Sequence, residues 1–204
     1  IHIPRVSSYE TIEFINSISK RSDISFAMNM ADLMHLLEPE LFPARWETDF
    51  LQFQTELWDL LKANKIYLLS NSSCEIDCED ELFRGNPAEI MEYSYLWVLS
   101  ELWKKRKVPL ATCLKMLSEN PAKRLGIYPQ KGCLEAGSDA DFVIYDPNLQ
   151  STVNGPNGNK VELTGEITEV WLKGELQTDD CPAQGEFVPR INSPKRRHNH
   201  HTWI

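Results

Sequence analysis

Short apolar strands and amphipathic helices alternate along the first half of this chain of 204 residues. Apolar runs predict strands at residues 1–6, 24–28 and 66–69, and apolar residues at helical spacing predict helices at 12–18 and 50–61. The third run is apolar throughout, as expected of a parallel strand that is buried on both faces. An order of strand, helix, strand, helix, strand favours a parallel sheet or barrel, so the expected class is α/β.

Local signals predict where several helices begin and end. Ser7 and Glu10 have the spacing of a capping box for the first helix. Asn120 is the expected N-cap of a helix that starts at Pro121, because the first helical residue has no use for an N–H, and Pro109 has the same role one helix earlier. A longer helix is expected over residues 88–105, with an apolar stripe of Met91, Tyr95, Leu99 and Leu102.

After Gly132 the sequence becomes rich in strand signals. Residues 142–145 predict a buried strand, and Asp146-Pro-Asn148 predicts a turn after it. Residues 167–172 alternate with a period of two, and Lys173-Gly174 predicts the turn that follows. This part of the chain is therefore expected to be rich in β-strands and to lack long helices.

Composition excludes some classes of partner. The net charge of -9 argues against a nucleic acid or an anionic membrane surface as partner of the folded body. No apolar run approaches the roughly 20 residues that a membrane-spanning helix needs. The five cysteines are scattered and no signal peptide is visible, so a reducing, cytoplasmic setting is expected. The chain begins with Ile1 inside an apparent strand, which suggests a fragment.

Several charged motifs resemble binding sites but have simpler interpretations. Residues 137–141 predict a tight turn whose glycine supplies an unusual φ and whose acids cap nearby backbone. The acidic run 75–81 lacks the spaced oxygen ligands of a calcium loop, so a solvated loop is expected, and Cys74 and Cys78 are interpreted as idle thiols. The last residues, 191–204, predict a disordered basic tail, in which histidines could bind a metal adventitiously.

Five segments in order resemble the cyclic amidohydrolases, and among them allantoinase first, with dihydropyrimidinase and dihydroorotase as relatives. They cover nearly the whole chain up to Arg190. The matching segments are Ile1-His-Ile-Pro-Arg-Val-Ser-Ser8, Pro43-Ala-Arg-Trp-Glu47, Leu57-Trp-Asp-Leu-Leu61 with Ile66-Tyr-Leu-Leu-Ser-Asn-Ser-Ser-Cys74, the stretch from Tyr95-Leu-Trp97 to Pro121-Ala-Lys123, and Gly185-Glu-Phe-Val-Pro-Arg190.

The resemblance implies a fold and a division of the chain. The family fold is a (β/α)8 TIM-like barrel of the metal-dependent hydrolases, with a small β-sandwich. Residues 1–130 would form the C-terminal half of that barrel, residues 131–190 the C-terminal strands of the sandwich, and residues 191–204 a tail. The first half of the barrel, which carries a His-x-His and a metal-bridging lysine in the family, would lie outside this chain.

The resemblance also implies a metal site, at which this chain lacks the expected ligands. Arg5 stands where the family has a metal-binding histidine, and a fixed cation cannot ligate a metal ion. Ala31 stands at the second histidine position, and Asn71 replaces the family's catalytic aspartate, which also shuttles a proton. His2 lies near Arg5 but is expected on the opposite face of the strand, and His35 could substitute for Ala31 only if the loop is rebuilt.

These observations lead to one preferred interpretation and two alternatives. The preferred one is an allantoinase-like homologue, related to purine catabolism, that is catalytically inactive, holds no zinc or other divalent ion, and has no catalytic residues of its own. It would act as a pseudoenzyme in a homo-oligomer or in a hetero-oligomer with a family member. The alternatives are an active cyclic-amide hydrolase with shifted ligands and a missing N-terminal half, and a truncated gene product.

Overall fold

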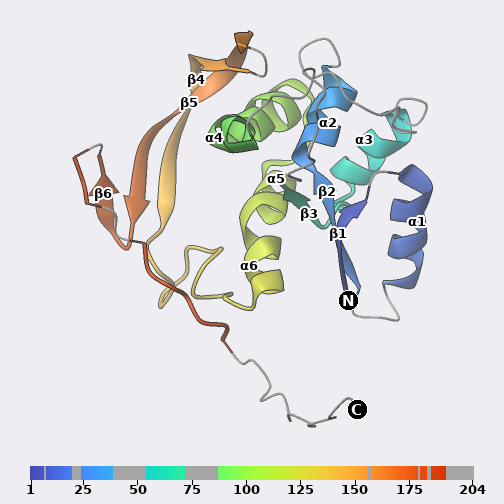
Figure 1. The fold of residues 1–204 in the computed structure, drawn as a ribbon, viewed down its shortest axis with the longest axis horizontal. Helices are drawn as coiled ribbons and strands as arrows, with labels where there is room; N and C mark the ends of the chain where they lie inside the picture. The colour runs from blue at the N-terminus through green and yellow to red at the C-terminus, as the bar shows by residue number, and fades with distance from the viewer. Residues whose placement is uncertain are drawn as a thin grey trace, which may run out of the picture.

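The fold combines a parallel sheet, an antiparallel sheet and a group of helices between them (Figure 1). The computed structural model describes residues 1–6, 8–19, 24–38, 54–71, 87–155, 158–178, 180–182 and 185–191. In chain order the elements are β1 (His2–Val6), α1 (Tyr9–Ile18), β2 (Ser25–Asn29), α2 (Met30–Leu37), α3 (Gln54–Lys62), β3 (Leu68–Ser70), α4 (Pro87–Trp97), η3 (Val98–Lys105), α5 (Leu110–Leu114), η4 (Lys115–Glu119), α6 (Asn120–Leu125), β4 (Phe142–Asn154), β5 (Lys160–Leu172) and β6 (Glu175–Gln177).

The parallel sheet has the order β1-β2-β3, which confirms the predicted alternation of strands and helices. The central strand β2 is buried along its whole length, including the polar residues Ser25 and Asn29 at its two ends. Met28 pairs with Val6 of β1 and with Leu69 of β3, so the three strands end at one level. The residues that follow them are therefore gathered at the carboxyl edge of this sheet, where α/β proteins place their functional groups.

The first helix begins one residue later than the sequence signal indicates. Ser8 is the N-cap of α1, and its hydroxyl accepts a hydrogen bond from the N–H of Thr11. The predicted capping box of Ser7 and Glu10 was wrong, because the third residue after Ser8 is Thr11 and not a glutamate; Ser7 itself lies outside the described residues. Ile12 and Ile15 are buried as predicted.

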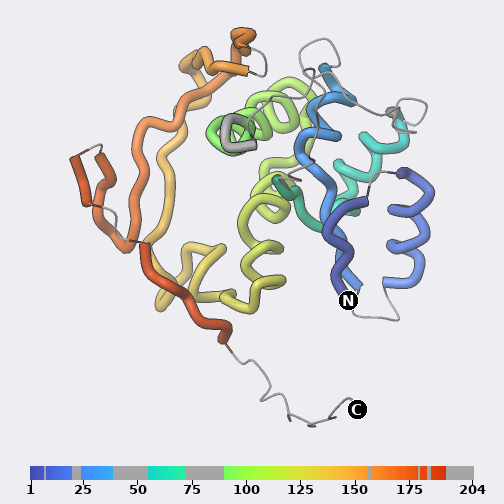
Figure 2. Tube along the Cα trace, viewed as in Figure 1, coloured from blue at the N-terminus to red at the C-terminus, as the bar shows by residue number. Residues whose placement is uncertain are grey.

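One long helical segment, α4 followed by η3, lies between the two sheets (Figures 1 and 2). Its predicted stripe was wrong at Met91, which is 60% exposed, whereas Trp97, Ser100 and Leu102 are fully buried. The segment 96–102 is buried nearly all round: β5 packs against it, and Trp97 reaches Glu38 directly after α2. A helix enclosed in this way is not limited to one apolar stripe.

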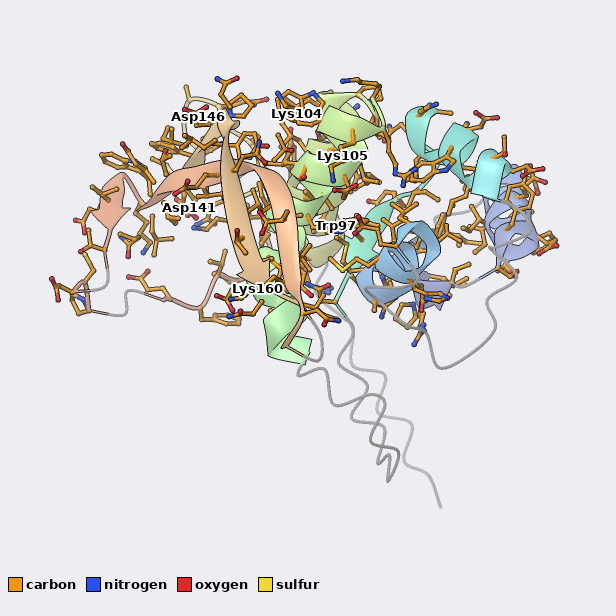
Figure 3. All side chains as sticks on the ribbon, turned by 90° about the horizontal axis from the view of Figure 1, so that it is seen from above. Trp97, Lys104, Lys105, Asp141, Asp146 and Lys160 are labelled. Atoms are coloured by element: carbon orange, nitrogen blue, oxygen red, sulfur yellow. The ribbon has the colours of Figure 1, made fainter. Side chains whose placement is uncertain are left out.

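The side of this helix that faces α2 carries a large aromatic side chain. Trp97 lies between the two helices (Figure 3), and its indole N–H donates to the Glu38 carboxylate at 3.3 Å. Burial and the neighbouring Glu101 carboxylate raise the pKa of Glu38. Glu101 is itself buried and forms an ion pair with Lys105 one turn later.

The next helical segment is continuous from Leu110 to Leu125. The prediction that Asn120 caps a new helix was wrong, because its side chain instead donates to the carbonyl of Tyr67 at 2.6 Å. This bond ties the helix to the chain entering β3, and Pro121 lies inside the helical run. Gly126 ends the helix with a left-handed φ of 75°.

The antiparallel sheet is a long hairpin of β4 and β5 with the short strand β6 at one side. Residues 142–145 begin β4, which confirms the predicted strand, but they are half-buried or exposed rather than buried. The prediction of a turn at Asp146-Pro-Asn148 was wrong, because these residues lie within β4. The register shifts between Asp146 and Gln150, and Asp146 accepts a hydrogen bond from the N–H of Asn148. The residues that signal a turn therefore form an irregular stretch within β4 instead of ending the strand.

The turn of residues 137–141 carries two aspartates that form ion pairs beside this sheet. Gly137 has a φ of 96°, and Asp141 accepts a hydrogen bond from the N–H of Lys173, as the sequence predicts for a glycine turn with capping acids. Lys131 forms ion pairs with both Asp139 and Asp141. Segment 185–191 lies beyond β6 and runs past the loop that carries this turn (Figure 2), and the N–H of Ile191 donates to the carbonyl of Gly126 at 2.6 Å.

Candidate functional site

The carboxyl edge of the parallel sheet brings together the positions that the sequence singled out. Arg5 lies near the end of β1, Ala31 is the second residue of α2 directly after β2, and Asn71 follows β3. Three different strands therefore deliver these residues to one edge. Their interpretation as counterparts of family ligands remains a prediction.

An ion pair joins the first two of these strand ends. The guanidinium of Arg5 donates from Nε to Oδ2 of Asp32 at 3.1 Å and from Nη2 to Oδ1 at 2.6 Å. Two parallel N–H···O bonds match the planar fork of a guanidinium to a carboxylate and fix the relative orientation of both side chains. The pair thus connects the end of β1 to the first turn of α2.

Asp32 is the buried partner of this pair. Its side chain is 5% exposed, whereas that of Arg5 is 29% exposed. Burial raises the pKa of Asp32, and the Arg5 guanidinium, together with His35 on the next turn of α2, opposes that rise. The carboxylate consequently depends on Arg5 for the charge compensation that water cannot supply.

Ala31 occupies a position defined by backbone geometry. Asn29, the last residue of β2, is the N-cap of α2, and its side-chain oxygen accepts from the N–H of Ala31 at 2.8 Å. The methyl group of Ala31 offers no lone pair. The N-cap amide and the Asp32 carboxylate therefore supply the polar groups of this strand-to-helix junction.

Asn71 takes part in a hydrogen bond to the long helix. Its Nδ2 donates to Oγ of Ser94 at 3.1 Å, which links the end of β3 to α4. The neighbouring Ser70 has a buried hydroxyl oxygen without a hydrogen-bond partner in the described part of the chain. The carboxamide of Asn71 has no basic oxygen of carboxylate strength.

Sequence reasoning missed Asp32, although a signal was present. An acid in the first turn of a helix that directly follows a buried strand is placed at a sheet edge, where it also complements the helix dipole. The position of His2 on the opposite face of the strand stays a prediction; its Nδ1 lies 2.9 Å from Oγ of Ser25, the residue of β2 with which it pairs. Cys74, Cys78, the acidic run 75–81 and the histidines of the tail lie outside the described residues.

Sequence relatives agree with this fold. The D-hydantoinase of Geobacillus stearothermophilus is 29% identical over 159 residues, which cover 67% of this chain and 34% of that protein. The probable allantoinase 2 of Dictyostelium discoideum is 26% identical over 203 residues, covering 85% of this chain and 39% of that protein. The chain therefore spans roughly a third of the length of the curated relatives it matches.

Solved structures show the same fold. The dihydropyrimidinase from Brevibacillus agri NCHU1002 superposes with a TM-score of 0.65 at 21% identity, over 86% of this chain and 44% of that chain. The described elements are thus arranged as in the corresponding part of that structure. The model of the amidohydrolase family matches residues 56–176, which is more than half of the sequence. The chain belongs to the amidohydrolase family, and its relatives are cyclic amidohydrolases.

Among the described residues, no helix combines the length and the apolar character that crossing a membrane demands.

Proposed function

We propose that this chain is a cyclic amidohydrolase homologue that does not carry out metal-dependent hydrolysis. The observation that carries the proposal is the bidentate ion pair between Arg5 and Asp32 at the carboxyl edge of the parallel sheet. It places a fixed positive charge and its matched counterion at the strand ends where the family resemblance implies divalent ions.

The residues at this edge do not fit such ions. A divalent cation of the zinc type needs neutral imidazoles, thiolates or carboxylates that converge on one point. Arg5 carries a permanent charge that repels a cation, and its counterion Asp32 is already engaged through both oxygens. Ala31 and Asn71 add a methyl group and a carboxamide. Among the described residues, no three His, Cys, Asp or Glu side chains gather as a possible metal site.

A chain of this kind would serve as a structural component of an assembly and not as a catalyst. We propose that it corresponds to the C-terminal half of the family barrel with the adjoining sandwich strands, and that it assembles with itself or with an active family member. Its coverage of 44% of a solved dihydropyrimidinase chain supports the first part of this proposal. The masses of the purified chain alone and after mixing with an active relative, measured by light scattering, test the second part.

Two measurements test the central proposal. Elemental analysis of the purified protein, after dialysis against zinc, is expected to find far less than one ion per chain. Hydrolysis of hydantoin, allantoin and dihydroorotate is expected to stay at the buffer rate, while the Geobacillus stearothermophilus D-hydantoinase, assayed in parallel, hydrolyses hydantoin. Stoichiometric zinc together with turnover of any of the three substrates would favour the alternative of an active hydrolase with shifted ligands.

A further inference from the structure

An acidic side chain fastens α2 at each of its two ends. In the first turn the Asp32 carboxylate binds the guanidinium of Arg5. At the other end Glu38 is the C-cap residue, and its backbone N–H donates to the carbonyl of Met34 at 2.9 Å. The Glu38 carboxylate accepts a hydrogen bond from the indole N–H of the fully buried Trp97 at 3.3 Å. Glu38 therefore joins the end of α2 to the middle of the long helical segment formed by α4 and η3.

The surroundings of Glu38 are unfavourable to a negative charge. The residue is half-buried, and it stands at the carboxyl end of α2, where unpaired backbone carbonyls concentrate partial negative charge. Glu101 of η3, which is 2% exposed, adds a second carboxylate from the neighbouring helix. The two nearby cations already have other partners: Lys105 forms an ion pair with Glu101, and the guanidinium carbon of Arg106 lies 4.6 Å from the ring centroid of Trp58.

The pKa of Glu38 reflects this balance. Burial raises the pKa most, and the Glu101 carboxylate raises it further. The indole N–H of Trp97 and the charges of the two nearby cations act in the opposite direction, but the net shift is upward. A protonated carboxyl group keeps a carbonyl oxygen that accepts the indole N–H, and it no longer repels Glu101. Protonation of Glu38 therefore preserves the hydrogen bond and removes the unfavourable charge.

We propose that Glu38 is a proton-operated latch, which in its neutral form holds the carboxyl end of α2 against Trp97 and in its ionised form lets that end open. The one N–H that Trp97 donates strengthens when the carboxylate is charged, but it does not offset the loss of water and the repulsion from Glu101. Ala31 and Asp32 lie in the first turn of the same helix of 8 residues, so an opening at its far end loosens the helix that carries them at the carboxyl edge of the sheet. The latch works in the same direction whether or not that edge holds a metal ion.

The test fixes the latch in its neutral state. Glu38→Gln keeps the length of the side chain and an oxygen that accepts the indole N–H, but it cannot ionise. Glu166→Gln, at an exposed glutamate of β5, is the matched control. Urea midpoints between about pH 4 and 7 measure the effect on the whole fold, and protection factors of backbone amides in hydrogen exchange measure local opening of α2. His35, the other titratable group in the last turn of α2, is present in every variant, so its titration cancels from the comparison.

The urea midpoints have an expected sign. A raised folded-state pKa gives stability that is complete below the ordinary value, about 4.3 for glutamate, and that is lost as pH rises through the folded-state value. The midpoint of Glu38→Gln is therefore expected to rise relative to wild type from acidic to neutral pH, whereas Glu166→Gln differs from wild type by the same amount throughout. In a protein that carries Glu101→Gln, which removes the neighbouring carboxylate, the gain from Glu38→Gln at neutral pH should shrink.

Hydrogen exchange distinguishes a latch from a general effect on stability. In wild type the N–H of Glu38, bonded to the carbonyl of Met34, should lose protection severalfold from acidic to neutral pH, and the N–H of Thr164 in β5 should lose less. In Glu38→Gln the protection at position 38 should stay constant. A difference between Glu38→Gln and wild type that does not change with pH, or an equal loss of protection at positions 38 and 164, would overturn the proposal. If Glu38→Gln does not fold, the wild-type chain decides, and protection of the Glu38 N–H that is the same at every pH overturns it.

Discussion

Arg5 at the end of β1 holds Asp32 in the first turn of α2 through two hydrogen bonds of 3.1 and 2.6 Å, and the two partners differ in their access to water. The Arg5 side chain is 29% exposed and that of Asp32 only 5%. Loss of Arg5 leaves an anion enclosed by protein, whereas loss of Asp32 leaves a cation that water can still reach. The pair is therefore expected to respond asymmetrically to substitution.

The first prediction concerns this asymmetry. Arg5→Ala is expected to lower the free energy of unfolding by about 3–5 kcal/mol at neutral pH, the range seen when a buried charge loses its partner. Asp32→Asn, which keeps the size of the side chain and some hydrogen bonding, should cost clearly less. Urea unfolding followed by tryptophan fluorescence measures both. Lys123→Ala, which removes an exposed ion pair with Glu119, is the control and should cost at most about 1 kcal/mol. Equal losses for Arg5→Ala and Asp32→Asn would contradict the prediction.

The second prediction concerns pH. Burial raises the folded-state pKa of Asp32 above its usual value of about 3.9, so the folded state takes up a proton more readily than the unfolded state. The contribution of Asp32 to the free energy of unfolding therefore falls as pH rises from its usual pKa through its raised folded-state pKa. Arg5→Ala removes a group that lowers this pKa, so its deficit in the free energy of unfolding should grow from acidic to neutral pH. Urea midpoints of both proteins, measured between about pH 4 and 7, check this, and a deficit independent of pH would refute it.

The third prediction concerns metal ions. A ligand that binds only the folded state raises the melting temperature, and one that does not bind leaves it unchanged. Because Arg5, Ala31 and Asn71 supply no ligand set, the melting temperature should be the same with zinc, with EDTA and without either. A variant that ends at Ile191 is the control, because it lacks the three histidines of the tail at positions 198, 200 and 201. A saturable rise in melting temperature with zinc, retained in this variant, would contradict the prediction.

The parallel strands and the edge they share followed from apolar runs in the sequence, because strands that are buried on both faces are mostly apolar. The polar residues Ser25 and Asn29 at the two ends of β2 are buried as well. Local capping signals were less informative. Asn120 has the side chain of an N-cap, but its amide is used for a tertiary bond to the carbonyl of Tyr67. That bond joins residues 53 positions apart, and no pattern within one helix announces it.

The candidate site, too, could be predicted from the sequence only in part. The resemblance singled out Arg5, but a cation at a strand end does not reveal its partner. Asp32 lies 27 positions away and becomes its neighbour only because β1 and β2 pair in parallel register. Whether Arg5 would face solvent or a buried carboxylate therefore depended on the tertiary structure, and the proposal of a metal-free edge rests on this contact.

The fourth prediction concerns the contact between the long helix and the hairpin. Ser100 of η3 is fully buried, and its hydroxyl accepts a hydrogen bond from the N–H of Thr164 in β5 at 2.8 Å. Ser100→Ala leaves this donor without its acceptor and should lower the free energy of unfolding by about 1–3 kcal/mol. Amide hydrogen exchange should show faster exchange at Thr164. Ser17→Ala, which removes an exposed bond to the carbonyl of Phe14, should stay within about 0.5 kcal/mol of wild type. Unchanged protection at Thr164 would show that the bond is dispensable.

The fifth prediction separates backbone strain from steric exclusion at Gly165. This residue of β5 has a φ of 97°, and a Cβ placed on it would lie 1.9 Å from the hydroxyl oxygen of Tyr145, which itself donates to the carbonyl of Thr164. Gly137 has nearly the same φ, 96°, with nothing within 4 Å of the same position. An alanine at Gly137 therefore meets only the conformational cost, about 1–2 kcal/mol. An alanine at Gly165 must also displace the ring of Tyr145, which overpacking data place at about 1–3 kcal/mol more.

The two glycine variants thus form a matched pair for urea unfolding. The free energy of unfolding should fall further for Gly165→Ala than for Gly137→Ala, and the difference should shrink when Tyr145→Leu is combined with Gly165→Ala, because the shorter side chain removes the clashing ring atoms. The comparison requires Tyr145→Leu alone, since that change also loses the hydrogen bond to Thr164. Equal losses for the two glycine variants would mean that Tyr145 moves aside at no cost and that only the left-handed backbone demands glycine at this point of β5.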